Sequence, residues 1–256
     1  MQMKRPTNRR PADRRIQLTL RIDGAPVVVD APQPPRHGRL DELLPAMHAI
    51  DNAAISHAVR KSEASGASVS CAKGCSACCR AQPVPVTPPE AFALLKLVEA
   101  MPVARRDEVE AHFAERAHRL LDAGLVDAFL DRDPDLTTQA ARELAMAYFQ
   151  LGLACPFLED DACSIHPQRP FVCRQYLVTS APELCADPFA NPVAVIPMPV
   201  RAASAVLAAS ESPLGSQQHT VPLTLALEYA RRHREELSRQ FDAEPLLRQW
   251  LRALIA

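Results

Sequence analysis

The sequence lacks an uninterrupted run of about 18 apolar residues, the length that a transmembrane helix needs. It also lacks the apolar stretch that follows the charged start of a secretory signal peptide. Only seven of its 256 residues are glycine, and it contains no phosphate-binding loop, dinucleotide fingerprint or nucleophile elbow. These absences predict a cytoplasmic protein that does not enter a membrane, and they exclude the commonest nucleotide-binding and hydrolase motifs.

Charge is nearly balanced over the whole chain, with a formal net charge of -1, but it is unevenly placed. The first 22 residues hold seven lysine or arginine residues and a single acidic residue, Asp13. Such an arm could contact nucleic acid, but it has no interleaved aromatic residues for base stacking. We therefore expect residues 1–15 to be a basic, disordered leader and nucleic acid not to be a partner.

Cysteine is confined to two clusters, and this is the most informative feature of the chain. The first cluster comprises Cys71, Cys75, Cys78 and Cys79, and the second comprises Cys155, Cys163, Cys173 and Cys185. Thiolates are soft ligands that select zinc, copper(I), iron and iron–sulfur clusters, and eight thiols divide into two sites of four. A chain of this length does not need disulfides to fold, and cytosolic thiols remain reduced. The cysteines are therefore predicted metal ligands.

Periodicity predicts a mainly α protein: a helical scaffold with an irregular cysteine-rich metal-binding region and a small N-terminal β-hairpin. The hairpin is expected over residues 16–29 with its turn at Asp23-Gly24, followed by a helix over 40–64. The predicted parts are the leader 1–15, a hairpin plus helix over 16–66, a metal-binding domain with a helical insertion over 67–200, and C-terminal helices over 201–256.

Three helices are expected between the two cysteine clusters. The first starts after a capping box formed by Thr87 and Glu90 and reaches about residue 101. The second starts at Pro102 and includes Leu120 and Leu121 on its apolar side, and the third runs from about 133 to 153. Antiparallel packing of these helices would return the second cluster to the first. Residues 155–199 show little periodicity and are expected to be ordered by metal ligation rather than by an apolar core of their own. Later helices are expected over 201–210, 222–241 and 243–256.

The sequence CAKGCSACC, followed by CPFLEDDACSIHPQRPFVCRQY, resembles the YkgJ-type cysteine-cluster family over residues 71–185. That family is described as a zinc- or iron-chelating domain and is related to the metal region of flagellin lysine-N-methylases. The resemblance implies that the chain binds zinc, iron or an iron–sulfur cluster through all eight cysteines. His166 stands where the family commonly has tyrosine, which makes it a possible additional ligand.

Four basic residues lie next to the cysteines, namely Lys73, Arg80, Arg169 and Arg174. Because a zinc ion with four thiolates has a net charge of -2, nearby cations would stabilise the site. We expect this outer-sphere role for Arg169 and Arg174, whereas Lys73 and Arg80 fit an ordinary surface position equally well.

Two other metal motifs are incomplete. The spacing of Cys71, Cys75 and Cys78 matches that of radical S-adenosylmethionine enzymes, but the expected aromatic residue before the last cysteine is Ala77, and the chain is helical and poor in glycine. Glu115 and His118 form one E-x-x-H pair, whereas di-iron bundles need two.

Two function classes remain open from the sequence. The first is a metal-binding protein, which could also have a protein partner. The alternative is a metal-dependent enzyme, such as an S-adenosylmethionine-dependent protein methylase, for which the sequence identifies no cofactor-binding residue.

Overall fold

The computed structural model describes residues 14–131, 136–215 and 218–254. Residues 1–13 of the predicted leader, Asp133 and Pro134 at the predicted start of the third helix, and the last two residues of the predicted C-terminal helix lie outside these ranges. The part of the chain that is described contains no helix long and apolar enough to span a bilayer.

The described chain is mainly helical, with four short two-stranded sheets. The strands are β1 Arg15–Ile22, β2 Ala25–Pro32, β3 His37–Gly38, β4 Pro85–Val86, β5 Leu158–Glu159, β6 Ala162–Cys163, β7 Val221–Pro222 and β8 Phe241–Asp242. The α-helices are α1 Leu44–Ala64, α2 Pro88–Glu99, α3 Val103–Asp122, α4 Val126–Leu130, α5 Thr138–Gln150, α6 Phe171–Gln175, α7 Ala202–Leu214, α8 Ala226–Arg232, α9 Arg234–Leu237 and α10 Ala243–Leu254. The 3₁₀ helices are η2 Leu40–Leu43, η3 Ala77–Arg80, η4 His166–Gln168, η5 Pro182–Ala186 and η6 Leu223–Leu225.

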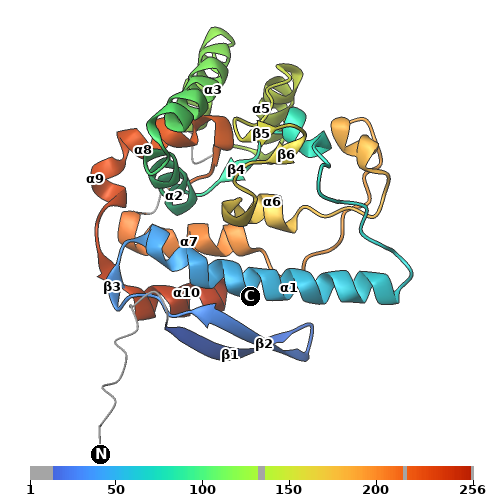
Figure 1. The fold of residues 1–256 in the computed structure, drawn as a ribbon, viewed down its shortest axis with the longest axis vertical. Coiled ribbons are helices and arrows are strands. Elements are labelled where there is room, and N and C mark those ends of the chain that lie inside the picture. Colours follow the sequence, from blue (N-terminus) through green and yellow to red (C-terminus); the bar gives the residue numbers. More distant parts are fainter. Residues whose placement is uncertain (1–13, 132–135, 216–217, 255–256) are drawn as a thin grey trace, which may run out of the picture.

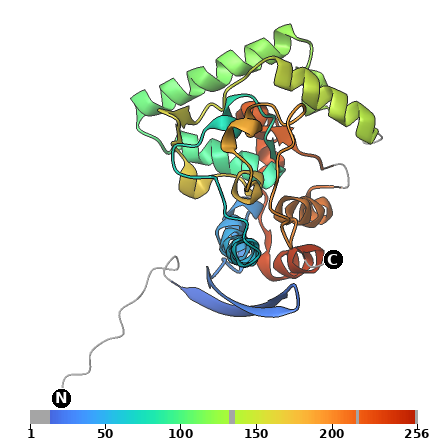
Figure 2. The same ribbon diagram turned by 90° about the vertical axis from the view of Figure 1, so that its right-hand side faces the viewer.

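The N-terminal hairpin forms as predicted. Asp23 and Gly24 both have positive φ, at 51° and 77°, which suits the tight turn of a twisted two-stranded hairpin. Alternate residues of β2, Val27, Val29 and Ala31, are buried, and β2 packs along α1. The hairpin and the pair α3 and α5 lie at opposite ends of the molecule in both views (Figures 1 and 2).

A single hydrophobic core joins segments that are far apart in the sequence. Helix α2 packs against α8, and α7 packs against α10, whose Trp250 is fully buried. The predicted capping box is present, because the Thr87 amide donates to the Glu90 carboxylate at 2.8 Å and the Glu90 amide donates to the Thr87 side chain. Helix α2 therefore begins and ends close to the predicted bounds.

Three details of the predicted helices are wrong. Leu121 is 63% exposed, because the buried stripe of α3 runs through Val109, Phe113 and Leu120 and does not include its neighbour. The third helix begins only at Thr138, where the Thr137 side chain accepts a bond from the Ala140 amide. The single helix expected over 222–241 is divided into β7, η6, α8 and α9.

The segment 155–199 is irregular, as expected, but it does have apolar anchors. Phe157, Ile165, Phe171 and Val178 are all buried, and the first three belong to the main core. Apolar contacts with the main core therefore stabilise this segment.

Candidate metal centre

The first cysteine cluster lies on a loop and a short 3₁₀ helix. Gly74 has a φ of 90°, and the Cys75 amide donates to the Ala72 carbonyl at 3.0 Å, so the chain reverses between Cys71 and Cys75. Cys78 and Cys79 both lie on η3, with their Sγ atoms 4.0 Å apart. Adjacent side chains usually diverge, but the tight turn of η3 keeps these two sulfurs in contact.

The second cluster is brought to the first by the tertiary structure. The Cys155 amide donates to the Cys79 carbonyl at 2.7 Å. Cys163 lies on β6, which pairs with β5. Cys173 lies within α6, and Cys185 lies on η5, which packs directly against η3. The Val178 amide also donates to the Cys71 sulfur at 3.4 Å. The predicted return of the second cluster to the first is therefore present.

Burial and neighbouring thiols raise the pKa of cysteines in both clusters. Burial raises the pKa of Cys155 to about 12 and that of Cys173 well above its ordinary value, and nearby thiols, including Cys163 and Cys78, add to both rises. Burial also raises the pKa of Cys71 and Cys185, and the neighbouring thiols Cys75 and Cys78 add to both of these rises. Cys78 thus contributes to the raised pKa of thiols in the first cluster and in the second.

The environment of these sulfurs suits thiolate ligands. Backbone amides oppose the burial-induced rise in pKa at three of them: Val178 at Cys71, Phe157 at Cys155 and Ile165 at Cys163. Amide donors of this kind stabilise a charged sulfur and orient it toward a metal. The donor set is therefore chemically suited to zinc or iron. No three His, Cys, Asp or Glu side chains of the described residues are placed closely enough to hold one ion, so binding requires the sulfurs to rotate inward to about 2.3 Å from a zinc ion.

The arginines near the cysteines have different surroundings. The positive charge of Arg169 opposes the effect of burial on the pKa of Cys71 and Cys163. Arg174 is buried and donates to the carbonyls of Arg169 and Pro167 and to the Asn52 side chain. Its hydrogen bonds therefore connect α6 to the end of η4 and to α1.

The remaining sequence candidates lie toward the surface. Arg80 pairs with Asp161, which also accepts a 2.8 Å bond from Ser76, so the first cluster is tied to the β5–β6 turn. Lys73 and His166 are both exposed. The pKa of His166 is lowered, chiefly by the positive charge of Arg169.

Helix α3 contributes contacts that the sequence did not reveal. Its side chains Arg105, His112, Arg116 and Arg119 all contact the segment 151–164. His112 therefore faces this segment, with its Nδ1 3.2 Å from the Pro156 carbonyl oxygen. The E-x-x-H pair beside it does not converge, because exposed His118 instead pairs with Asp122 at 3.0 Å. The sequence did carry one sign of this contact: the spacing of Arg105, His112, Arg116 and Arg119 places them on one face of an α-helix.

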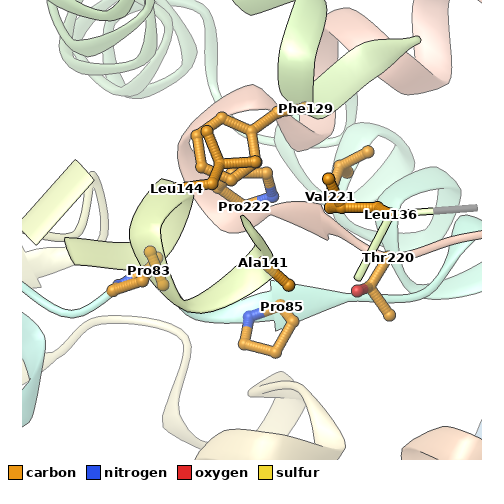
Figure 3. Close-up of a pocket in the computed structure, with 10 residues that line it drawn as sticks. Pro83, Pro85, Phe129, Leu136, Ala141, Leu144, Thr220, Val221 and Pro222 are labelled. Atoms are coloured by element: carbon orange, nitrogen blue, oxygen red, sulfur yellow. The ribbon is translucent and has the colours of Figure 1, made fainter. Parts of the chain in front are cut away.

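An apolar cavity of about 270 Å³ lies between the β4–β7 pair, α4 and α5 (Figure 3). It is lined by Pro83, Pro85, Phe129, Leu136, Ala141, Leu144, Ala145, Thr220, Val221 and Pro222. Among these lining residues there is one hydroxyl group, no charged side chain and no cysteine. The cavity is therefore separate from the thiols and offers few polar partners for a nucleoside.

Comparison with curated proteins and with solved structures gives no match. Comparison with protein families matches residues 70–188 to the CxxCxxCC family, described as "Putative zinc- or iron-chelating domain". The matched range contains all eight cysteines, η3, α3 and α6. Over residues 70–188, the predicted resemblance to a zinc- or iron-chelating cysteine-cluster family is therefore confirmed.

Proposed function

We propose that this chain is a cytoplasmic metal-binding protein that holds zinc, iron or an iron–sulfur cluster through two groups of four cysteines. The observation that supports this most strongly is that the tertiary structure joins the two cysteine clusters: the Cys155 amide donates to the Cys79 carbonyl at 2.7 Å, and η5, which carries Cys185, packs against η3. In addition, Cys78 contributes to the raised pKa of thiols in both clusters.

The thiols that raise one another's pKa also suggest which cysteines would share a metal. Cys71, Cys75 and Cys185 form one group, and Cys155, Cys163 and Cys173 form the other. Cys78 and Cys79, whose sulfurs are in contact, would each complete one group of four. Bound metal would order the site and balance part of the negative charge of its thiolates. The Arg169 guanidinium would offset a further part of that charge.

Anaerobic purification followed by metal and acid-labile sulfide analysis tests this proposal. Structural zinc predicts a colourless protein with about two zinc ions per chain, because zinc is d¹⁰. An iron–sulfur cluster predicts sulfide together with charge-transfer absorption near roughly 400 nm. A folded, reduced protein that contains no metal and takes up neither added zinc nor added iron would contradict the proposal. If the protein delivers its metal to a protein partner, that partner is expected to bind the metal-loaded form.

A further inference from the structure

One face of α3 lies along the second cysteine segment and binds its main chain. The ring Nδ1 of His112 lies 3.2 Å from the Pro156 carbonyl oxygen, and Arg116 Nε donates to the Ala154 carbonyl at 3.2 Å. At the two ends of this face, Arg119 donates to the Leu151 carbonyl and Arg105 pairs with Glu159. The contacts bracket Cys155, and three of the four are to carbonyl oxygens.

Arg116 occupies the central position on this face. Its side chain is only 19% exposed, and it is oriented by two further contacts, a 3.2 Å bond from Nη1 to the His112 carbonyl and a 2.8 Å ion pair with Glu115. A guanidinium with several fixed partners loses little freedom with each added bond, so it can hold a carbonyl in one place.

The peptide unit between Ala154 and Cys155 is held from both sides. Its carbonyl accepts from Arg116, and its N–H donates to the Cys79 carbonyl at 2.7 Å. Hydrogen bonds on the two ends of one peptide polarise and strengthen each other. This peptide therefore connects α3 to η3, the helix that carries Cys78 and Cys79.

We propose that Arg116 is a positioning residue of the metal centre, which fixes Cys155 against η3 through the Ala154–Cys155 peptide. The inference rests on the proposed metal-binding function.

Three substitutions in the full chain test this role. Arg116→Gln removes the charge and the guanidinium donor, whereas Arg116→Lys keeps the charge but lacks the planar fork that reaches two carbonyls. Arg119→Gln is the matched control, because it removes a carbonyl contact of the same helical face that lies nearer the end of α5.

Two measurements separate positioning from general stability. The first is amide hydrogen exchange of residues 154–158 in the reduced, metal-free protein, which should be about tenfold faster in Arg116→Gln and in Arg116→Lys but unchanged in Arg119→Gln. The second is the affinity for cobalt(II), followed by thiolate-to-cobalt absorption. This affinity should fall about tenfold in Arg116→Gln and in Arg116→Lys, and it should stay close to that of the unsubstituted protein in Arg119→Gln.

The outcomes distinguish this inference from the proposed function. Unsubstituted protein that takes up no metal would overturn the proposed function, and the exchange measurement would still decide whether Arg116 fixes Cys155. If the protein takes up metal but Arg116→Gln and Arg119→Gln have the same exchange rates and the same cobalt(II) affinity, the role of Arg116 alone would be overturned.

Discussion

The amide of Cys155 donates a hydrogen bond of 2.7 Å to the carbonyl oxygen of Cys79. This bond joins the two cysteine clusters through their main chains, so it does not depend on either sulfur. Changing a cysteine to serine therefore leaves the connection between the clusters in place, and the effects of such changes on metal binding can be examined in a folded protein.

Cys163→Ser should remove the metal of one cysteine group and spare the other. We expect the metal content to fall by about one ion per chain, because each proposed group has four ligands and replacing one opens that site. Metal analysis, together with mass spectrometry of alkylated cysteines, would measure the change. Cys71 and Cys75 should remain protected from alkylation in Cys163→Ser, and exposure of both groups together would contradict the proposed division.

Glu90→Ala should destabilise the fold by about 3 kcal/mol, because it leaves buried amide groups without partners. Glu90 is 3% exposed, and its carboxylate accepts from the Thr87 amide and, at 2.7 Å, from the Phe171 amide at the start of α6. Urea denaturation would measure the free energy of unfolding. Glu99→Ala is the control on the same helix, since it removes only an exposed ion pair with Arg234 and should cost less than about 1 kcal/mol. Equal losses in the two variants would contradict this role of Glu90.

Asp51→Asn should remove a pH dependence of stability. Asp51 is fully buried on α1, and burial raises its pKa to about 7, although a 2.7 Å bond from Gln175 opposes the rise. The folded protein therefore binds a proton more tightly than the unfolded chain, whose aspartate has a pKa of about 3.9. The contribution of Asp51 to the free energy of unfolding is therefore fully present below about pH 4 and is lost as the pH rises through about 7.

The difference between those two pKa values corresponds to roughly 4 kcal/mol as an upper bound. Above pH 7, Asp51→Asn should therefore unfold at a higher denaturant concentration than the unsubstituted protein, while retaining an acceptor for Gln175. Denaturation curves between pH 5 and 8 would test this, with exposed Asp127→Asn as a control. Parallel pH profiles for the unsubstituted protein and Asp51→Asn would contradict the prediction.

Metal binding should release protons and strengthen as the pH rises. Burial raises the pKa of Cys71, Cys155, Cys163, Cys173 and Cys185, so these thiols are neutral near pH 7 in the metal-free protein. Each must lose its proton to bind a metal as thiolate. Zinc titration calorimetry in two buffers of different ionisation enthalpy would count the protons released. The observed heat should depend on the buffer, and identical heats in both buffers would contradict neutral thiols.

Local sequence patterns predicted the elements that depend on neighbouring residues. The hairpin turn at Asp23-Gly24 and the capping box of Thr87 and Glu90 both form as expected, because positive φ and helix capping are decided within a few residues. The sequence did not reveal that the Glu90 carboxylate also reaches the Phe171 amide. That contact joins residues from distant segments, and no periodicity encodes it.

The sequence by itself determined the chemistry of this protein: eight thiols in two clusters, flanked by arginines, on a chain long enough to fold without disulfides. Only the tertiary structure decided which thiols are neighbours, since the gaps in the second cluster are too long for local turns to close. Cys155 reaches Cys79, and Cys185 reaches η3, because α3 and the buried Phe157 and Phe171 hold the intervening chain. Long-range packing of this kind depends on the whole core, whereas ligand type depends on single residues.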